Sequence, residues 1–431
     1  MNIKIRLTVM NFLQFAVWGA YLVSMGIFLG RAGFAEKIGW FYTTQGFVSL
    51  FMPAVIGIVA DRWVPAQKLL GFCHLIAAVC MAGAAYAGSQ ASISFPLLFT
   101  FYTLSVAFYM PTLALSNSVA YTALRQQGLD TVKVFPPIRV FGTVGFICAM
   151  WVTNFYFQAS YTQWYFSASL GILLGLYSFT LPACPTGIAK AKTLSEALGL
   201  KAFALFKQKK MAVFFIFSML LGMSLQVTNG FAAPFITGFN NLEGYTGSWG
   251  ANNATALISL SQISETLCIL LIPFFLKRFG IKKVMLISMF AWVLRFGFLG
   301  VGNPTTFTGV LLLVASMIVY GVAFDFFNVS GSLYVEQETD PSIRSSAQGV
   351  FMLMTNGFGA AIGSWAAQKV INALVNSHMN PADMVGGVYP AAVSQQIMSG
   401  WSNSWFIFAG FSLVVAILFA VCFQYKHTPQ H

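Results

Sequence analysis

The sequence predicts an all-α integral membrane protein with twelve membrane-spanning helices. Of the 431 residues, 58 % are hydrophobic and 16 % are aromatic, whereas only 8 % are charged, which excludes an ordinary soluble globular protein. One crossing takes about 20 apolar residues, so a chain of this length accommodates about twelve crossings joined by short loops. Apolar windows of that size recur twelve times along the chain.

The twelve windows fall into two groups of six. The first group is predicted at residues 6–30, 37–60, 68–88, 96–121, 137–158 and 163–183, and the second at 211–238, 252–276, 282–301, 307–335, 346–372 and 401–424. The fifth helix is predicted to begin at Pro136 and Pro137, because proline is tolerated in the first turn of a helix but not in its interior.

A long, polar and basic segment separates the two groups. We therefore expect an N-terminal six-helix bundle at residues 1–184, a cytoplasmic linker at 185–210 and a C-terminal six-helix bundle at 211–431. The linker contains an amphipathic pattern, L-S-E-A-L-G-L-K-A-F-A-L-F, which predicts a helix lying on the cytoplasmic surface of the membrane. Two such bundles with a solute held at their interface are a common plan of secondary transporters.

The net charge of +12 reflects membrane topology and predicts no nucleic-acid partner. Most of the 23 Lys and Arg residues fall on alternate loops, starting with Lys4 and Arg6, and few lie near the other side. This asymmetry obeys the positive-inside rule if both termini are cytoplasmic. The six cysteines have no metal-ligand spacing, and no nucleophile–base pair is apparent. We therefore expect no metal, no cofactor and no enzyme activity.

The tenth predicted helix carries a carboxylate in its middle. Asp325 stands beside Phe324, Phe326 and Phe327, in an apolar run that begins at Leu311. A charged side chain at membrane depth costs roughly 2.5–3.5 kcal/mol on insertion scales, so such a group marks a cavity, a partner or an ion path. The alternative is that Asp325 only pairs with a buried Arg and holds two helices together.

Polar side chains recur at helical spacing in five of the predicted helices. Residues three, four or seven positions apart share one face of a helix. These faces comprise Gln14, Trp18 and Tyr21; Arg139, Thr143 and Phe146; Gln226 and Asn229; Gln262 and Glu265; and Tyr320, Phe324, Phe327 and Asn328, with Asp325 beside them. A single amide side chain in such a helix often only forms a hydrogen bond to a neighbouring helix. Five polar faces favour a shared solute cavity.

The residue types on these faces indicate a neutral polar ring compound, such as a nucleoside or a sugar. Amides offer donors and acceptors together, as hydroxyl groups and heterocycle edges require, and aromatic rings supply a flat apolar surface. A strongly anionic solute fits poorly, because Arg139 would be its only cation. Arg295 stands apart from these faces, and we expect it to snorkel to the membrane surface or to form a structural pair.

The turn after the second predicted helix reads G-I-V-A-D-R-W, from Gly57 to Trp63. It resembles part of the signature loop of the major facilitator superfamily, although the further Gly and basic pair of that pattern are missing. Asp61 and Arg62 at facing helix ends would latch the two bundles in one state of the transport cycle through charge and helix-dipole contacts. The alternative is a solvated turn.

Longer motifs carry a more specific resemblance. They are F-P-P-I-R-V-F-G-T-V-G-F-I, F-S-M-L-L-G-M-S-L-Q-V-T-N, S-Q-I-S-E-T-L, S-M-I-V-Y-G-V-A-F-D-F-F-N-V-S-G-S and A-Q-G-V-F-M-L-M-T-N-G-F-G. They closely resemble the bacterial nucleoside permeases, the nucleoside:proton symporter family of the major facilitator superfamily. The likeness runs from the first helix to the twelfth, and it thins in the linker and in two outer loops, near 240–252 and 376–400.

The resemblance implies a substrate-binding site and a proton-coupled import mechanism. The matching positions are Arg139, Thr143, Phe146, Gln226, Asn229, Gln262, Glu265, Tyr320, Phe324 and Asp325. The sequence departs from the family pattern after Asn229. This departure, at residues 230–234, bears on which nucleoside the protein prefers more than on whether its substrate is a nucleoside. For the proton we favour Asp325, because burial disfavours an ionised carboxylate, and we keep Glu265 as the other candidate.

The sequence therefore predicts a proton-coupled symporter that imports nucleosides such as uridine or adenosine across the bacterial inner membrane by alternating access. Its expected partners are the nucleoside, the proton and the lipid bilayer, and we expect it to act as a monomer. One alternative is a proton symporter for another neutral ring compound, a sugar or a nucleobase. A second is a solute sensor that does not transport, although no extra soluble domain is present to carry a signal.

Overall fold

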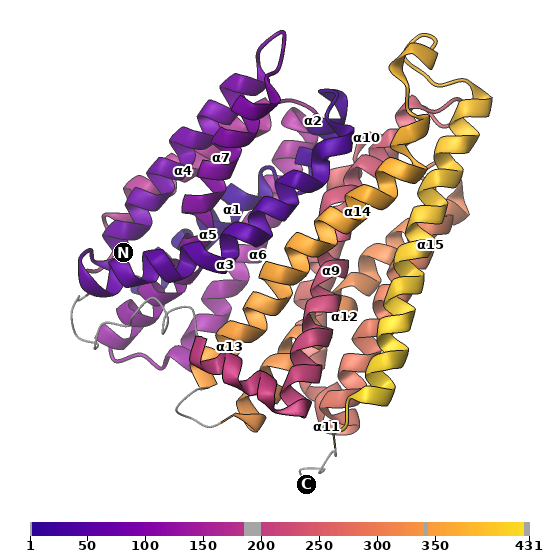
Figure 1. The fold of residues 1–431 in the computed structure, drawn as a ribbon. Coiled ribbons are helices and arrows are strands. Elements are labelled where there is room, and N and C mark those ends of the chain that lie inside the picture. Colours follow the sequence, from indigo (N-terminus) through magenta and orange to yellow (C-terminus); the bar gives the residue numbers. More distant parts are fainter. Residues whose placement is uncertain (1, 185–199, 340–343, 426–431) are drawn as a thin grey trace. The chain divides into compact units, whose positions relative to one another are not determined.

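The computed structural model describes residues 2–184, 200–339 and 344–425, and these residues form helices joined by short turns (Figure 1). The chain divides into two compact units, which are described here one at a time. The first unit comprises Met1–Phe28 and Thr44–Lys201, and the second comprises Leu29–Thr43 and Ala202–His431.

The residues that the structure describes contain the twelve predicted crossings. Eight helices in the described ranges are long and apolar enough to cross a membrane. One of them, α11 (Ala254–Val301), contains two crossings, because Gly280 interrupts it with φ 75° and ψ 167°. The remaining three are α1 (Ile3–Gly19) with α2 (Met25–Arg31), α3 (Ile38–Arg62) and α7 (Thr162–Ser178). The prediction of an all-α membrane protein is confirmed.

The other helices follow the predicted order. Those before the linker are η1 (Ala35–Lys37), α4 (Ala66–Gly88), α5 (Phe95–Gln126), α6 (Thr131–Val152) and the π-helical η2 (Thr153–Phe157). Those after it are η3 (Leu200–Lys207), α9 (Lys209–Gly238), η4 (Phe239–Asn241), α10 (Trp249–Asn252), α12 (Phe307–Glu338), α13 (Arg344–Met352), the π-helical η5 (Leu353–Gly359), α14 (Ala360–Leu374), η6 (Asn376–His378), η7 (Pro381–Asp383) and α15 (Ala391–Cys422).

Helix α6 begins before the position that its prolines predicted. It starts at Thr131, and the Val134 N–H donates to the Asp130 carbonyl at 3.0 Å. Pro136 and Pro137 therefore lie inside the helix rather than at its start. Because proline has no N–H group, the two hydrogen bonds that these positions would donate to the preceding turn are missing from α6.

The first and last crossings also differ from their predicted ranges. The first is interrupted at residues 20–24, where the Ala20 carbonyl accepts a hydrogen bond from the Thr153 hydroxyl at 2.8 Å. This side chain satisfies a carbonyl that the helix leaves unpaired. The last crossing begins at Ala391, ten residues earlier than predicted, directly after Pro390. Proline is favoured at a helix start, so it marks this boundary better than the apolar window did.

Two expectations from the sequence fall on residues that are not described. The amphipathic pattern of the linker spans residues 194–206; its first part, 194–199, lies outside the described ranges, and the rest lies in the 3-10 helix η3. Helix α3 ends at Arg62, but the side chains of Asp61 and Arg62 also lie outside the description. That Asp61 and Arg62 latch the two bundles remains a prediction.

Small residues let helices approach closely within each unit. In the first unit, a Cβ atom on Gly19 of α1 would lie 2.8 Å from the Phe146 Cα of α6, and Gly145 of α6 meets the Phe12 backbone in the same way. In the second unit, a Cβ atom on Gly321 of α12 would lie 2.6 Å from the Ser264 carbonyl carbon of α11. These contacts fix the register of the helices that carry the candidate site residues.

We predict that one such glycine is needed for stability. A Cβ atom on Gly222 of α9 would lie 2.8 Å from the Cα of Thr355 in η5, whereas none would lie within 4 Å at Gly410 of α15. Gly222→Ala should therefore destabilise the protein by about 1–3 kcal/mol, the usual cost of overpacking. Gly410→Ala should leave the midpoint of thermal unfolding in detergent unchanged or raise it, since Ala favours helices over Gly by about 1 kcal/mol. Equal midpoints for the two variants would contradict this packing.

Candidate functional site

The candidate residues of the second unit gather around the middle of α12. Asp325 is buried, with 4 % of its surface exposed, and its Oδ2 atom has no hydrogen-bond partner among the described residues. Glu265 and Cys268 of α11 lie within electrostatic range of the carboxylate. Of the flanking rings, Phe326 packs against Phe275 at 5.0 Å between ring centroids, and the buried Phe327 lines the cavity beside Phe324. Asp325 is thus a buried acid with one unused acceptor.

One helical turn earlier, two aromatic rings of α12 form a flat surface. The rings of Tyr320 and Phe324 lie 5.8 Å apart and are nearly parallel, with an interplanar angle of 5°. Trp292 of α11 meets Tyr320 edge-on at 6.0 Å. Tyr320 is buried, whereas Phe324 is only half-buried. Tyr320 and Phe324 therefore share one face of α12, as their spacing of four residues predicted.

Helices α9 and α11 add the amide side chains. Asn229 donates through Nδ2 to Gln226 Oε1 at 3.4 Å, so the predicted pair on α9 does lie together. On α11, the Gln262 side chain lies close to the Tyr320 hydroxyl. All three amides are half-buried. Gln262 and Glu265 therefore both adjoin the α12 residues that the sequence grouped with them.

A small cavity lies in the second unit beside Phe324. Its lining includes Leu225 of α9, Trp292 of α11, Asn328 of α12 and Asn356 of η5. The Asn328 Nδ2 atom donates to the Phe324 carbonyl at 3.2 Å, which leaves its side-chain oxygen available. Asn356 was not singled out by periodicity, because it lies in a π-helical turn where the spacing of 3.6 residues does not hold.

Arg295 lies deep in the second unit and not at its surface. Only 2 % of its surface is exposed, its Nη1 atom donates to the Ser316 carbonyl at 2.8 Å, and its guanidinium carbon lies 4.5 Å from the centre of the Tyr320 ring. Of the two alternatives that the sequence left for Arg295, snorkelling was wrong; the residue instead makes structural contacts to a carbonyl and an aromatic ring of α12. Sequence spacing along its own helix could not reveal these partners.

In the first unit, Arg139, Thr143 and Phe146 follow one another along α6. The Arg139 guanidinium carbon stands 3.8 Å from the centre of the Phe15 ring of α1, a cation–π contact. Phe146 is buried and meets the Trp18 ring edge-on at 6.3 Å, whereas Thr143 is half-buried. Arg139 also acts electrostatically on the Tyr109 hydroxyl of α5.

The Gln14 side chain forms hydrogen bonds inside the first unit. Its Nε2 atom donates to Thr112 Oγ1 at 2.7 Å, its Oε1 atom lies 2.8 Å from His74 Nε2, and its backbone carbonyl accepts from the Tyr109 hydroxyl at 2.8 Å. Gln14 thus holds helices together, the alternative that applies to any single amide in a membrane helix. His74 was missed by the sequence reasoning, although a His in an apolar run is itself a signal.

The candidate residues therefore form two groups, one in each unit. Arg139, Thr143 and Phe146 share a face of α6, and the other seven candidates come from α9, α11 and α12. Throughout the described ranges, no three His, Cys, Asp or Glu side chains are arranged to hold a metal ion. The chemistry that the second group offers is hydrogen bonding, ring stacking and the exchange of a proton at a buried carboxylate.

Comparisons with known proteins agree with this chemistry. A family model described as nucleoside H⁺ symporter matches residues 1–428. The chain is 44 % identical over 431 residues to the nucleoside permease NupG of Escherichia coli K12, covering 99 % of this chain and 97 % of that protein. It is 45 % identical over 435 residues to the xanthosine permease of the same organism, covering 100 % and 98 %.

A solved structure supports the same assignment at the level of the fold. The crystal structure of a mutant form of the nucleoside transporter NupG matches with a TM-score of 0.88 and 43 % identity, and the match covers 98 % of this chain and 100 % of that chain. These relatives are transporters, so the expectation that the protein is not an enzyme is confirmed. The chain belongs to the nucleoside H⁺ symporter family: it is a proton-coupled nucleoside transporter with the fold of the major facilitator superfamily.

Proposed function

We propose that this symporter binds its nucleoside with the two groups of candidate residues and carries its proton on Asp325. The observation that carries the proposal is the position of Asp325. It is a buried acid with an unused oxygen, close to Glu265 and next to the stacked pair of Tyr320 and Phe324. Ionisable groups inside membrane helices are costly, and they commonly mark proton or solute paths.

The residue types around Asp325 suit a nucleoside. The amides of Gln226, Asn229 and Gln262 supply donors and acceptors for ribose hydroxyls and for the polar edge of a base. The half-buried Phe324 ring, backed by Tyr320, supplies a surface on which a flat base stacks. Arg139 and Thr143 of α6 would add donors from the first unit.

Proton coupling requires a group that is protonated on one side of the membrane and deprotonated on the other. Burial favours the protonated form of a carboxylate, and a second carboxylate nearby favours it further. Asp325 is buried and lies within electrostatic range of the Glu265 carboxylate, so we propose that the two acids share the transported proton. A nucleoside that binds more tightly when the pair is protonated would link solute movement to proton movement.

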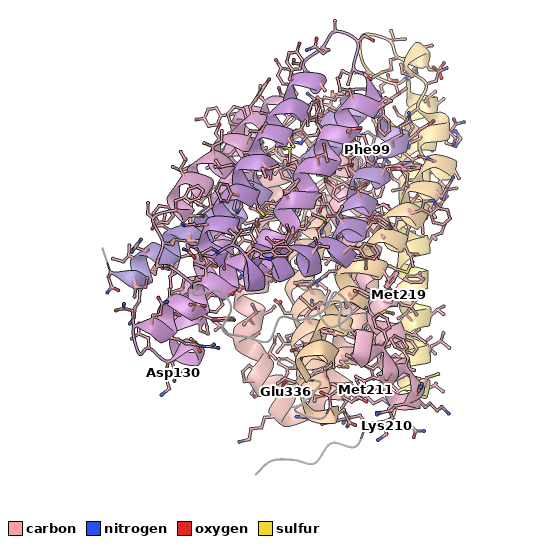
Figure 2. All side chains as sticks on the ribbon, turned by 60° about the vertical axis from the view of Figure 1, so that its left-hand side comes forward. Phe99, Asp130, Lys210, Met211, Met219 and Glu336 are labelled. Atoms are coloured by element: carbon pink, nitrogen blue, oxygen red, sulfur yellow. The ribbon has the colours of Figure 1, made fainter. Side chains whose placement is uncertain are left out.

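We further propose that the protein lies in the bacterial inner membrane with both termini in the cytoplasm. In the second unit, Lys209 and Lys210 begin α9, and Lys277, Arg278, Lys282 and Lys283 surround Gly280. These basic residues lie at one end of the unit: Figure 2 shows Lys210 and Glu336 at the lower end of the view, and Lys282 Nζ donates to the Ala420 carbonyl near the end of α15 at 2.9 Å. The positive-inside rule makes this end cytoplasmic. Twelve crossings then return the N-terminus to the same side.

The choice of substrate within the class is tested by counterflow. Purified protein in liposomes is loaded with uridine, and exchange is competed with adenosine, xanthosine, uracil, xylose and lactose. Xanthosine is included because one relative is a xanthosine permease. Competition by nucleosides alone supports the proposal, and competition by sugars alone would favour the alternative solute class. Binding without exchange would indicate a sensor.

The first prediction from the proposed function concerns the amide pair on α9. Gln226→Ala or Asn229→Ala should weaken nucleoside binding about tenfold or more, because a buried polar group of the substrate left without a partner costs about 1–3 kcal/mol. Gln396→Ala, which removes an exposed amide on α15, is the matched control. Calorimetric titration of the purified variants measures the affinity. Unchanged affinity in both α9 variants would remove this pair from the binding site.

The second prediction concerns base stacking. Phe324→Leu should keep part of the nucleoside affinity, and Phe324→Ala should lose more, because stacking on an aromatic ring contributes about 0.5–1.5 kcal/mol beyond its buried area. Ribose should compete poorly with uridine for the unmodified protein. If ribose competes as well as uridine, the base does not stack at this surface.

The third prediction concerns the proton. Asp325→Asn keeps the shape of the protonated side chain but releases no proton, so it should abolish uridine accumulation driven by a pH gradient. Nucleoside exchange should persist in this variant and should no longer depend on pH. Uptake into proteoliposomes with an imposed gradient, beside counterflow at several pH values, measures both.

Glu265→Gln is the comparison that assigns the role. If Asp325→Asn still concentrates uridine against its gradient and Glu265→Gln does not, the proton is carried by Glu265.

A further inference from the structure

The cavity beside Phe324 is lined by a buried side chain whose hydrogen-bond donor is not used. Trp292 of α11 lines this cavity with only 1 % of its surface exposed, and its Nε1–H group has no acceptor among the described residues. An indole N–H can only donate, and a buried donor without a partner is costly, so most such groups are paired. A bound solute that brings an acceptor into the cavity would satisfy this group.

Asn328 of α12 contributes the opposite kind of group to the same cavity. Its Nδ2 atom donates to the Phe324 carbonyl at 3.2 Å, which fixes the orientation of the amide. The side-chain oxygen takes no part in this bond and can accept a hydrogen bond from a ligand. Asn328 and Phe324 are both half-buried, so a solute can reach this wall of the cavity.

The other lining residues are apolar or use their polar groups elsewhere. The apolar ones come from α9 and α12 and are Leu221, Gly222, Leu225, Ala323 and Phe327. The Thr355 hydroxyl donates to a carbonyl of its own helical turn at 3.0 Å, and the Asn356 amide nitrogen lies 3.8 Å from Met352 Sδ. Trp292 and Asn328 thus supply one donor and one acceptor to a small cavity with largely apolar walls.

A hydroxyl group satisfies such a donor and such an acceptor together. Its oxygen accepts from an N–H group and its hydrogen is donated, whereas a carbonyl group only accepts. We propose that Trp292 and Asn328 form a subsite for one hydroxyl group of the nucleoside ribose: Trp292 Nε1 donates to the hydroxyl oxygen, and the hydroxyl donates to Asn328 Oδ1. The proposal rests on the proposed nucleoside site beside Phe324 and names the substrate group that this part of the site recognises.

The test compares the binding of uridine with that of 2′-deoxyuridine, 3′-deoxyuridine and 5′-deoxyuridine by calorimetric titration. In the unmodified protein, loss of the hydroxyl that enters the subsite should weaken binding about tenfold or more, because the buried N–H of Trp292 then has no acceptor. Trp292→Phe keeps an aromatic ring and removes this N–H. It should weaken uridine binding by a similar factor, and one of the three analogues should then bind about as tightly as uridine, because the two losses are not additive.

A second tryptophan provides the matched control. Trp405 of α15 is also buried, and its Nε1–H group also has no partner among the described residues, but it lies outside the lining of this cavity. Trp405→Phe should leave the affinity for uridine and the ranking of the analogues unchanged. Asn328→Ala removes the acceptor and should abolish the same analogue difference as Trp292→Phe. It therefore replaces Trp292→Phe if that variant does not fold.

The outcomes separate this proposal from the one on which it rests. If Trp292→Phe weakens uridine and all three analogues by one common factor, a water molecule and not the ribose occupies the subsite, and the proposal is overturned. The proposal is also overturned if Trp292→Phe leaves all four affinities unchanged. Phe324→Ala tests the underlying site: a normal uridine affinity in that variant would overturn the stacking surface, whether or not the analogue difference depends on Trp292.

Discussion

The cost of holding charge inside a membrane is the constraint on which the rest of this structure depends. Asp325 and Arg295 are both buried in the second unit, and neither sits in a direct ion pair within the described ranges. Hydrocarbon would not tolerate them, so the helices around them must supply polar groups and a shielded interior. The Ser316 carbonyl and the Tyr320 ring do this for Arg295. The half-buried side chains of Gln226, Asn229 and Gln262 are further polar groups inside the same unit.

Close helix packing is what makes that interior possible. Ser264 donates to the Ile318 carbonyl, and Ser288 donates to the Ala323 carbonyl at 2.5 Å, so both parts of α11 are tied to α12 on either side of Tyr320. Gly321 allows the first of these approaches. In the first unit, Gly19 and Gly145 bring α1 against α6 and set the height of Arg139 and Phe146. Small side chains thus position the large functional ones.

Much of this architecture followed from the sequence, and its exceptions have physical causes. Hydropathy found every crossing, and helical spacing grouped Gln226 with Asn229 and Tyr320 with Phe324, because these are properties of one helix. Spacing could not show that Arg295 reaches Tyr320 or that Gln14 is bonded to His74, because both contacts join different helices. Proline rules placed the start of α6 too late, and the π-helical η5 hid Asn356. Predictions from spacing within one helix therefore failed for side chains whose contacts lie on another helix.

The tight turn at Gly280 has a consequence for protein engineering. With a single residue outside helical geometry between the two crossings of α11, there is almost no spare chain at that point. A reporter or affinity tag inserted there would disturb the crossings that carry Glu265 and Arg295 together. The exposed stretch around Gly386 and Gly387, which already adopts positive φ angles and follows the short helix η7, is the better place to attach a label. The position of the tag would thus decide whether the tagged protein keeps the pH dependence of transport of the untagged protein.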